Sequence, residues 1–128
     1  MAINFNHDSV FNLNPMNKKE VVEEVNHLLI DGEVIVLAFK TVRDQLIFTN
    51  KRIIAVDIQG LTGTKKGFSI LPYANIQYFT FQTPSIGELL LADSELYLVF
   101  NNGFKTKFEF SGNVDITLLG RVISEVIL

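Results

Sequence analysis

The sequence predicts a mainly β domain of the α+β class, with seven antiparallel strands in a barrel or sandwich and a helix at each end. Three observations support this prediction. Side chains alternate with a period of two through most of residues 33–111, as they do in half-buried strands. No connection in this range is long enough for the crossover helix that joins parallel strands. Apolar residues recur at helical spacing before and after it.

The composition is that of an ordinary globular protein. The chain has 128 residues, of which 48% are hydrophobic and 20% charged, enough for one domain with its own core. We expect this domain to span residues 15–128, after a flexible segment at residues 1–14. No apolar run approaches the roughly 18 residues that cross a bilayer, and the start lacks the features of a signal peptide. A cytoplasmic location is therefore expected.

The two helices are expected at residues 15–31 and 113–128. In the first, Asn17 and Glu20 have the spacing of a capping box, and Pro15 offers a second start signal. The second helix has an apolar stripe, and we expect it to cap the open end of the curled sheet. The stripe consists of Leu119, Val122, Ile123 and Val126.

Short turns separate the seven expected strands. Asn102-Gly103 is the strongest hairpin signal in the chain, and Asn50-Lys51 suits a second two-residue turn. The expected strands occupy residues 33–42, 45–49, 52–59, 68–71, 76–83, 95–100 and 104–110.

The glycine-rich stretch GLTGTKKG, at residues 60–67, suggests either a phosphate-binding loop or a connection between strands. A Walker-type loop requires Gly-Lys and then Ser or Thr at the start of a helix. Here Gly63 precedes Thr64, and strands lie on both sides. The context favours a strand connection. A weak anion site at Lys65 and Lys66 remains the alternative.

The net charge of −3 is unevenly distributed along the chain. Residues 1–39 sum to −4, residues 40–66 to +4 and residues 67–128 to −3. The acidic flanks can neutralise the basic block in the folded chain, and nucleic-acid binding, which usually requires a basic domain, is not expected. The block can also attract an anion or a membrane surface. The anion-binding candidates are Lys40, Arg43, Lys65 and Lys66.

No group of residues has the pattern of a catalytic or metal site. The chain has no Cys and only two His, His7 and His27, whereas a metal needs several converging ligands. None of the serines lies in a G-x-S-x-G turn. We therefore expect no catalytic residue, no metal and no cofactor, and a protein that is not an enzyme.

Several apolar side chains are expected to point away from the core if the alternation is right. Two explanations for them remain open. The first helix can cover them, or a second copy of the protein can, since a contiguous exposed apolar area marks an interface. These candidate oligomer-interface residues are Ile47, Ile53, Tyr78, Tyr97 and Val99.

Three segments of the chain each match a short sequence motif. Residues 44–52 read D-x-x-hydrophobic-x-T-x-K-R, residues 57–65 read D-x-Q-G-x-x-G-x-K, and residues 71–76 read hydrophobic-P-Y-x-x-I. The matching residues are Asp44, Thr49, Lys51, Arg52, Asp57, Gln59, Gly60, Gly63, Lys65, Leu71, Pro72, Tyr73 and Ile76. With these motifs, residues 20–127 resemble the bacterial pleckstrin-homology (PH)-like domain family.

The resemblance implies a PH-like fold, no enzymatic activity and self-association, since ring-like homo-oligomers are known in the family. Eukaryotic PH relatives often bind phosphoinositides through basic residues around the first hairpin loop. Here that loop offers only Lys40 and Arg43, without the spaced basic cluster of the lipid-binding pattern. We therefore expect a scaffold module that self-associates and binds a protein partner. Weak anionic-ligand or membrane-surface binding through the basic loops is the alternative.

Overall fold

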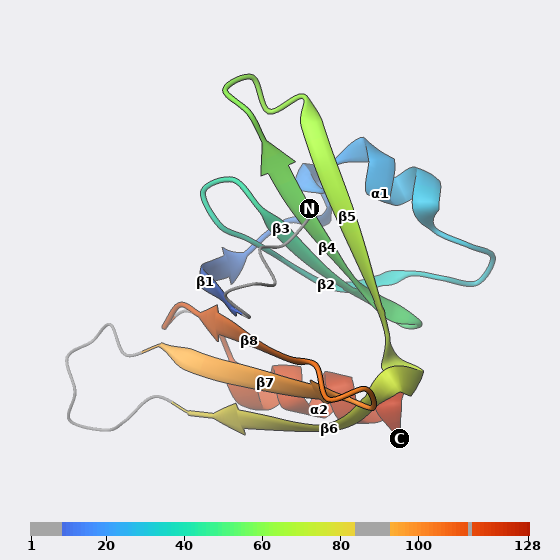
Figure 1. Ribbon diagram of the computed structural model, residues 1–128, viewed down its shortest axis with the longest axis vertical. Coiled ribbons are helices and arrows are strands. Elements are labelled where there is room, and N and C mark those ends of the chain that lie inside the picture. The colour runs from blue at the N-terminus through green and yellow to red at the C-terminus, as the bar shows by residue number, and fades with distance from the viewer. Residues whose placement is uncertain (1–8, 84–92, 113) are drawn as a thin grey trace.

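Eight strands form a single strongly bent sheet (Figure 1). The structure is a computed structural model, and it describes residues 9–83, 93–112 and 114–128. The strands are β1 (Ser9–Pro15), β2 (Ile35–Lys40), β3 (Gln45–Thr49), β4 (Arg52–Gln59), β5 (Lys65–Pro72), β6 (Ile76–Gln82), β7 (Ser94–Phe100) and β8 (Lys105–Phe110). The helices are η1 (Lys18–Glu20), α1 (Glu23–Leu28), η2 (Tyr73–Asn75) and α2 (Ile116–Ile127), of which η1 and η2 are 3-10 turns.

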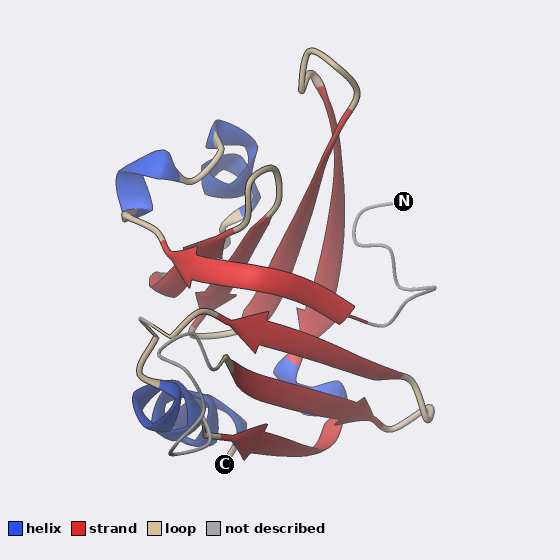
Figure 2. Ribbon diagram, turned by 90° about the vertical axis from the view of Figure 1, so that its left-hand side faces the viewer, coloured by secondary structure: helices blue, strands red, loops and turns tan. Residues whose placement is uncertain are grey.

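The sheet bends into two layers and forms a sandwich rather than a closed barrel (Figure 2). Its strand order is β5-β4-β3-β2-β1-β8-β7-β6, so β1 joins the two layers. On the opposite side, the chain passes from β5 to β6 through η2, and these two strands do not pair. This mainly β sandwich with a C-terminal helix confirms the predicted fold class, with eight strands instead of seven.

The additional strand is β1, which lies in a segment predicted from the sequence to be flexible; residues 1–8 lie outside the described residues. β1 pairs antiparallel with β2 and parallel with β8, which corrects the all-antiparallel prediction. A crossover helix is unnecessary, because these parallel partners come from opposite ends of the chain. Asn12 has a φ of 60° and interrupts the pairing with β8 between Val10 and Leu13. Because of this irregularity, the segment lacks the regular period-two alternation of side chains by which a strand is predicted from a sequence.

Two short helical segments, the 3-10 turn η1 and the six-residue helix α1, replace the single helix predicted at residues 15–31. The capping box is confirmed: the Lys19 amide donates to Asn17 Oδ1 at 2.9 Å, and the Asn17 amide donates to Glu20 Oε2 at 3.0 Å. The chain is then extended at Val21 and Val22, with ψ of 133° and 142°, before α1 begins. Branching at Cβ lowers the helix propensity of valine, and burial of Val21 stabilises the extended backbone in this position.

Two apolar clusters lie on opposite faces of strands β2–β4. The main core fills the sandwich, where the Phe39 and Phe110 rings meet edge to face at 4.9 Å between centroids. The second cluster lies under α1 and includes Val21 and Val25. Because β3 and β4 are covered on both faces, they read as continuous apolar runs.

The C-terminal helix α2 packs against the sandwich beside β6 and η2. It begins at Ile116, where the Leu118 amide donates to the Asp115 side chain at 3.1 Å, rather than at the predicted residue 113. Leu119 and Ile123 of the predicted stripe are buried. No helix within residues 9–83, 93–112 and 114–128 has the length and apolar character to cross a membrane.

Candidate interaction surface

The residues predicted to point outward from the sheet divide into two groups, and the first group is buried. Ile47 lies fully buried in the cluster under α1, which is one of the two explanations that the sequence left open. Ile53 lies in the main core, so its predicted orientation was wrong. β4 directs Ile53 and Ala55 into the sandwich, and Ile54 and Val56 toward α1, the reverse of the expected assignment.

The remaining three residues, Tyr78, Tyr97 and Val99, lie side by side on the outer face of β6 and β7. Tyr78 pairs across the ladder with Val99, and Tyr97 pairs with Thr80. Alternate residues of β7, including Leu98, point into the core, so Tyr97 and Val99 point outward. The exposed fraction of Tyr78 is 54%, and the other two are half-buried. We call these three residues the β6–β7 patch.

Charged side chains surround the β6–β7 patch. The Tyr97 hydroxyl donates to the Glu95 carboxylate, and this hydrogen bond raises the pKa of Tyr97. The Lys107 ammonium lies 6.0 Å from the centroid of the Tyr97 ring. On β8, burial raises the pKa of Glu109, and a hydrogen bond with Asp93 raises it further. An apolar centre with a polar rim is the usual composition of a protein–protein interface.

Two of the predicted anion ligands form ion pairs with the acidic N-terminal segment. Lys40 Nζ lies 2.6 Å from Glu20 Oε1, and Lys66 Nζ lies 3.1 Å from Glu24 Oε2. The hydrogen bond from Lys40 lowers the pKa of Glu20. The pKa of Glu24 is lowered by a backbone hydrogen bond and then by Lys66. The N-terminal segment therefore neutralises part of the basic block.

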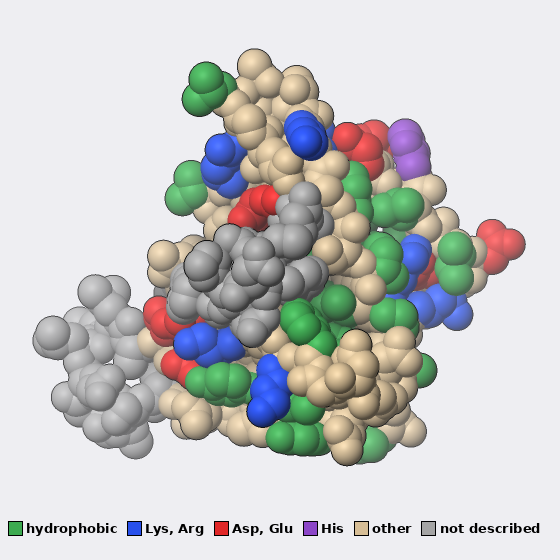
Figure 3. Space-filling model, in the orientation of Figure 1, with side chains coloured by type: hydrophobic (Ala, Val, Ile, Leu, Met, Phe, Trp, Pro, Cys, Tyr) green, Lys and Arg blue, Asp and Glu red, His purple; other side chains and the backbone are tan. Residues whose placement is uncertain are grey.

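The other two candidates lie at one end of the molecule, Arg43 in the β2–β3 loop and Lys65 next to the β4–β5 loop. The Arg43 guanidinium donates to the Gly60 carbonyl and links the β2–β3 loop to the β4–β5 loop. At the tips of these loops, Val42 and Leu61 are completely exposed, and Lys65 is exposed at the start of β5. Figure 3 shows hydrophobic and basic side chains together around this end.

An open pocket of about 480 Å³ lies beside these loops and contains two carboxylates. Asp44 Oδ1 accepts from the Ile58 amide at 3.2 Å, and Asp57 Oδ2 accepts from Gln59 Nε2 at 2.6 Å. Burial raises the pKa of Asp44, and the nearby charge of Asp57 adds to this increase. Because carboxylates face the pocket, it is poorly suited to an anion. Within the described residues, no three His, Asp or Glu side chains form a metal-binding group.

Several residues of the family motifs form a buried polar network instead of a binding site. Glu33 has a fully buried side chain, and Arg52 donates to it twice, from Nε at 2.9 Å and from Nη2 at 3.0 Å. Thr49 Oγ1 donates to the same carboxylate at 2.6 Å, and the Tyr73 hydroxyl donates to the Thr49 carbonyl at 2.7 Å. Burial acts to raise the pKa of Glu33, but the hydrogen bonds from Arg52 and Thr49 outweigh it and lower the pKa. Thr49, Arg52 and Tyr73 are therefore structural residues.

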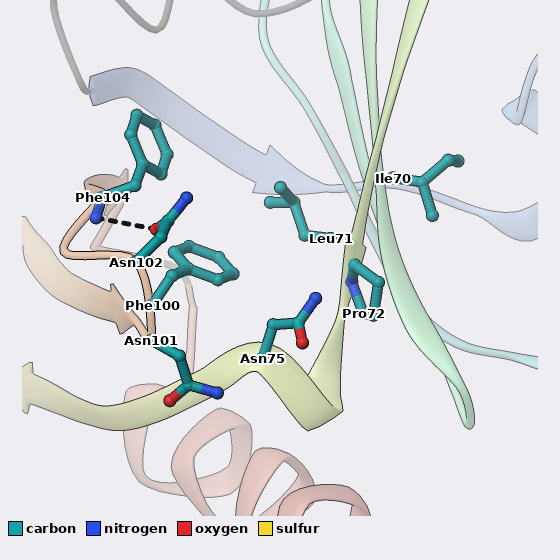
Figure 4. Close-up of a pocket in the computed structure, with 8 residues that line it drawn as sticks. All are labelled: Ile70, Leu71, Pro72, Asn75, Phe100, Asn101, Asn102 and Phe104. Atoms are coloured by element: carbon teal, nitrogen blue, oxygen red, sulfur yellow. Dashed lines mark hydrogen bonds between the residues drawn. The ribbon is translucent and has the colours of Figure 1, made fainter.

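A further pocket, of about 360 Å³, lies where β5 meets η2 and the turn between β7 and β8 (Figure 4). Phe100 and Phe104 contribute its aromatic wall, and the carboxamides of Asn75, Asn101 and Asn102 contribute its polar groups. Asn102 Oδ1 is already engaged, since it accepts from the Phe104 amide at 3.0 Å. Among the described residues, none that lines this pocket has an acidic, basic or nucleophilic side chain. No local sequence pattern marks this pocket, because its walls come from segments distant in the chain.

A bent β sandwich capped by a C-terminal helix defines a pleckstrin-homology-like domain. Several of its motif residues stabilise this fold from within. The family model described as the bacterial PH domain matches residues 4–127, and the chain belongs to this family. This confirms the resemblance inferred from the sequence motifs.

The individual relatives agree with this assignment. The uncharacterised protein YjqA of Bacillus subtilis is 44% identical over 85 residues, which cover 66% of this chain and 66% of that protein. A crystal structure of a DUF1696-family protein with a pleckstrin-homology domain from Shewanella loihica is 29% identical, with a TM-score of 0.78, over 93% of this chain and 100% of that one. A pleckstrin-homology domain from Shewanella amazonensis is 31% identical, with a TM-score of 0.65, over 88% and 90%.

Proposed function

We propose that the protein is a cytoplasmic, non-enzymatic scaffold module that self-associates through the β6–β7 patch and then presents the assembly to a protein partner. The observation that carries this proposal is the 54% exposure of Tyr78 beside Val99 and Tyr97 on one sheet face. Tyrosine rings bury a large area while their hydroxyls remain solvated, which makes them frequent in interfaces.

The chemistry of the pockets supports a non-enzymatic role. The described residues that line the pocket beside Phe100 carry only amide and apolar side chains. The pocket beside Asp44 contains carboxylates, but the described residues that line it include no histidine or lysine to act as a base for a nucleophile. Catalysis requires such groups to be positioned together, whereas binding another protein surface does not.

Self-association can be tested by light scattering after size-exclusion chromatography. We expect the wild type to elute as an oligomer and Tyr78→Lys to shift toward the monomer, because the substitution places a charge in the centre of the patch. Ile70→Lys is a matched control, since Ile70 is a 39% exposed apolar residue on β5. A wild type that remains monomeric from micromolar concentrations upward would refute the proposal, and circular dichroism would verify that each variant is folded.

A second candidate function is weak binding to an anionic membrane surface through the β2–β3 and β4–β5 loops. It is favoured by the complete exposure of Val42 and Leu61 close to Arg43 and Lys65. Aliphatic tips with adjacent cations suit the boundary between lipid headgroups and acyl chains. Co-sedimentation with phosphatidylserine vesicles tests this function. Binding should fall for both Val42→Ser/Leu61→Ser and Lys65→Ala/Lys66→Ala, and equal binding by wild type and variants would reject it.

A further inference from the structure

The pocket of about 360 Å³ beside Phe100 has walls that backbone hydrogen bonds hold in place. The Asn101 amide donates to the Asn75 carbonyl at 2.8 Å and so ties the β7–β8 turn to η2. Within the turn, the Phe100 amide donates to the Phe104 carbonyl at 2.8 Å, and the Gly103 amide donates to the Phe100 carbonyl at 2.9 Å. Ligand pockets are usually preformed, with volumes of about 300–1,000 Å³. This pocket can therefore accept a small ligand without rearrangement of the backbone.

An aromatic wall and an aliphatic wall face each other across the pocket (Figure 4). Phe100, only 5% exposed, belongs to the main core, and Phe104 packs against that core. Their ring centroids lie 5.8 Å apart, with 40° between the ring planes. On the side of β5, Leu71 and Pro72 form the aliphatic wall. The space between two apolar walls suits a flat ring, which can contact both of them.

Three asparagine carboxamides supply the hydrogen-bonding groups of the pocket. Asn102 Oδ1 accepts from the Phe104 amide at 3.0 Å, which orients this carboxamide and leaves its Nδ2 amino group as a donor. The exposed carboxamides of Asn75 and Asn101 form no hydrogen bond with any other described residue. A carboxamide offers a donor and an acceptor side by side. A purely apolar ligand would remove these groups from water without pairing them, which costs free energy.

The pocket differs from the basic loops and from the pocket beside Asp44 in carrying no charge. Among its described lining residues, none has an ionisable side chain. A charged ligand would lose its water there without gaining an opposite charge, and such burial is costly. The ligand should therefore be neutral and flat, and should donate and accept hydrogen bonds at neighbouring atoms.

We propose that this pocket binds a neutral planar heterocycle of the nucleobase type. The ring lies between Phe100 and Leu71. One edge of the ring forms hydrogen bonds with the carboxamide of Asn75 or Asn101. Nucleobases carry a donor and an acceptor at adjacent positions, and asparagine pairs with such an edge of adenine through two hydrogen bonds. Their faces also stack on aromatic side chains. Because no described lining residue is cationic, a phosphate attached to the base adds nothing to binding. This inference is independent of self-association.

A titration followed by NMR tests the proposal, with adenosine, guanosine, cytidine and uridine as probes. We expect at least one of them to bind with a dissociation constant of about 1 mM or lower. The largest shifts should fall on residues 70–75 and 100–104, including the side-chain amides of the three asparagines. Ribose should cause no shift, and the matching nucleoside monophosphate should bind no more tightly than the nucleoside.

Three outcomes of this titration would overturn the proposal. The first is no saturable shift with any of the nucleosides, or shifts centred on another part of the chain. The second is an equal response to ribose, which would indicate a sugar site. The third is much tighter binding of the monophosphate, which would indicate an anion site.

Variants test the carboxamides directly. Asn75→Ala/Asn101→Ala removes two of them, and the dissociation constant should rise about tenfold. Asn102→Asp keeps an acceptor for the Phe104 amide but replaces the amino donor with a negative charge, so binding should weaken by a similar factor. Asn26→Asp, at an exposed position of α1, is the control of equal charge and should bind like the wild type. Unchanged resonances outside the pocket would verify the fold of each variant. Wild-type affinity in both pocket variants, or equal weakening by Asn26→Asp, would overturn the proposal.

Discussion

Arg52 binds Glu33 through two parallel hydrogen bonds, from Nε at 2.9 Å and from Nη2 at 3.0 Å, and so closes a buried polar network that joins the segment before β2 to β3 and β4. The Glu33 side chain is fully buried, and that of Arg52 is 19% exposed. Arg52 also donates to the Leu28 carbonyl at 2.8 Å, which ties the end of α1 to the sheet. One motif arginine thus positions both the carboxylate and the helix that covers the second apolar cluster.

Removal of the arginine is expected to destabilise the fold strongly. Arg52→Met leaves the Glu33 carboxylate buried without its partner, and breaking a buried pair typically costs about 3–5 kcal/mol. Urea denaturation would measure this loss. Lys51→Met is the control, since Lys51 is exposed in the same turn. The double variant Glu33→Met/Arg52→Met should recover much of the stability, and a double variant as unstable as Arg52→Met would contradict the buried-charge explanation.

The same pair predicts a dependence of stability on pH. The folded-state pKa of Glu33 lies below its ordinary value of 4.5. Ionised Glu33 therefore contributes stability that is fully present above pH 4.5 and is lost as pH falls through the folded-state pKa. The free energy of unfolding of Glu33→Gln should fall less between about pH 7 and about pH 3 than that of the wild type. An equal fall in both proteins would show that Glu33 is not the titrating group.

Asp44 is expected to have the opposite effect. Burial, with Asp57 nearby, raises its pKa, so the ionised form is disfavoured in the folded state and the protein gains stability as pH falls through the folded-state pKa. Asp44→Asn keeps an acceptor oxygen for the Ile58 amide and removes the charge. We expect a higher Tm for this variant at neutral pH, with the gain shrinking in acid. Asp31→Asn, in an exposed loop, should show no such gain.

Strands whose ends are marked by turn residues could be predicted closely from the sequence. β3 and β4 begin and end at the predicted residues, because Asn50-Lys51 separates two apolar runs. The glycine-rich stretch connects β4 and β5, as expected, with Gly60 and Gly63 both at positive φ, but the connection ends at residue 64 because β5 begins at Lys65, three residues before the predicted start. These signals are local, so they are visible in a sequence without knowledge of the tertiary contacts.

Features that depend on tertiary contacts could not be predicted in this way. Strand β1 exists because β2 and β8 bind it from opposite sides, and Asn12 disrupts its alternation. In β4, all of residues 53–56 are fully buried, so polarity does not tell which face each one takes. The buried acid Glu33 was missed for a related reason: its partner Arg52 is 19 residues away.

The ion pairs of the N-terminal segment give a final prediction, on the membrane alternative. Glu20 and Glu24 are exposed acids that pair with the half-buried Lys40 and Lys66, so their neutralisation should change the stability of the fold only slightly. If the basic loops bind anionic surfaces, Glu20→Gln/Glu24→Gln should bind phosphatidylserine vesicles more strongly, and added salt should weaken that gain.

A control of equal net charge separates local from global electrostatics. Asp31→Asn/Glu125→Gln removes two exposed charges in a loop and on α2, away from the paired lysines. Co-sedimentation should increase for the Glu20/Glu24 variant and remain near the wild-type value for this control. Equal increases would mean that only net charge matters, and no increase in either would mean that the lysines freed from their ion pairs do not bind the lipid surface.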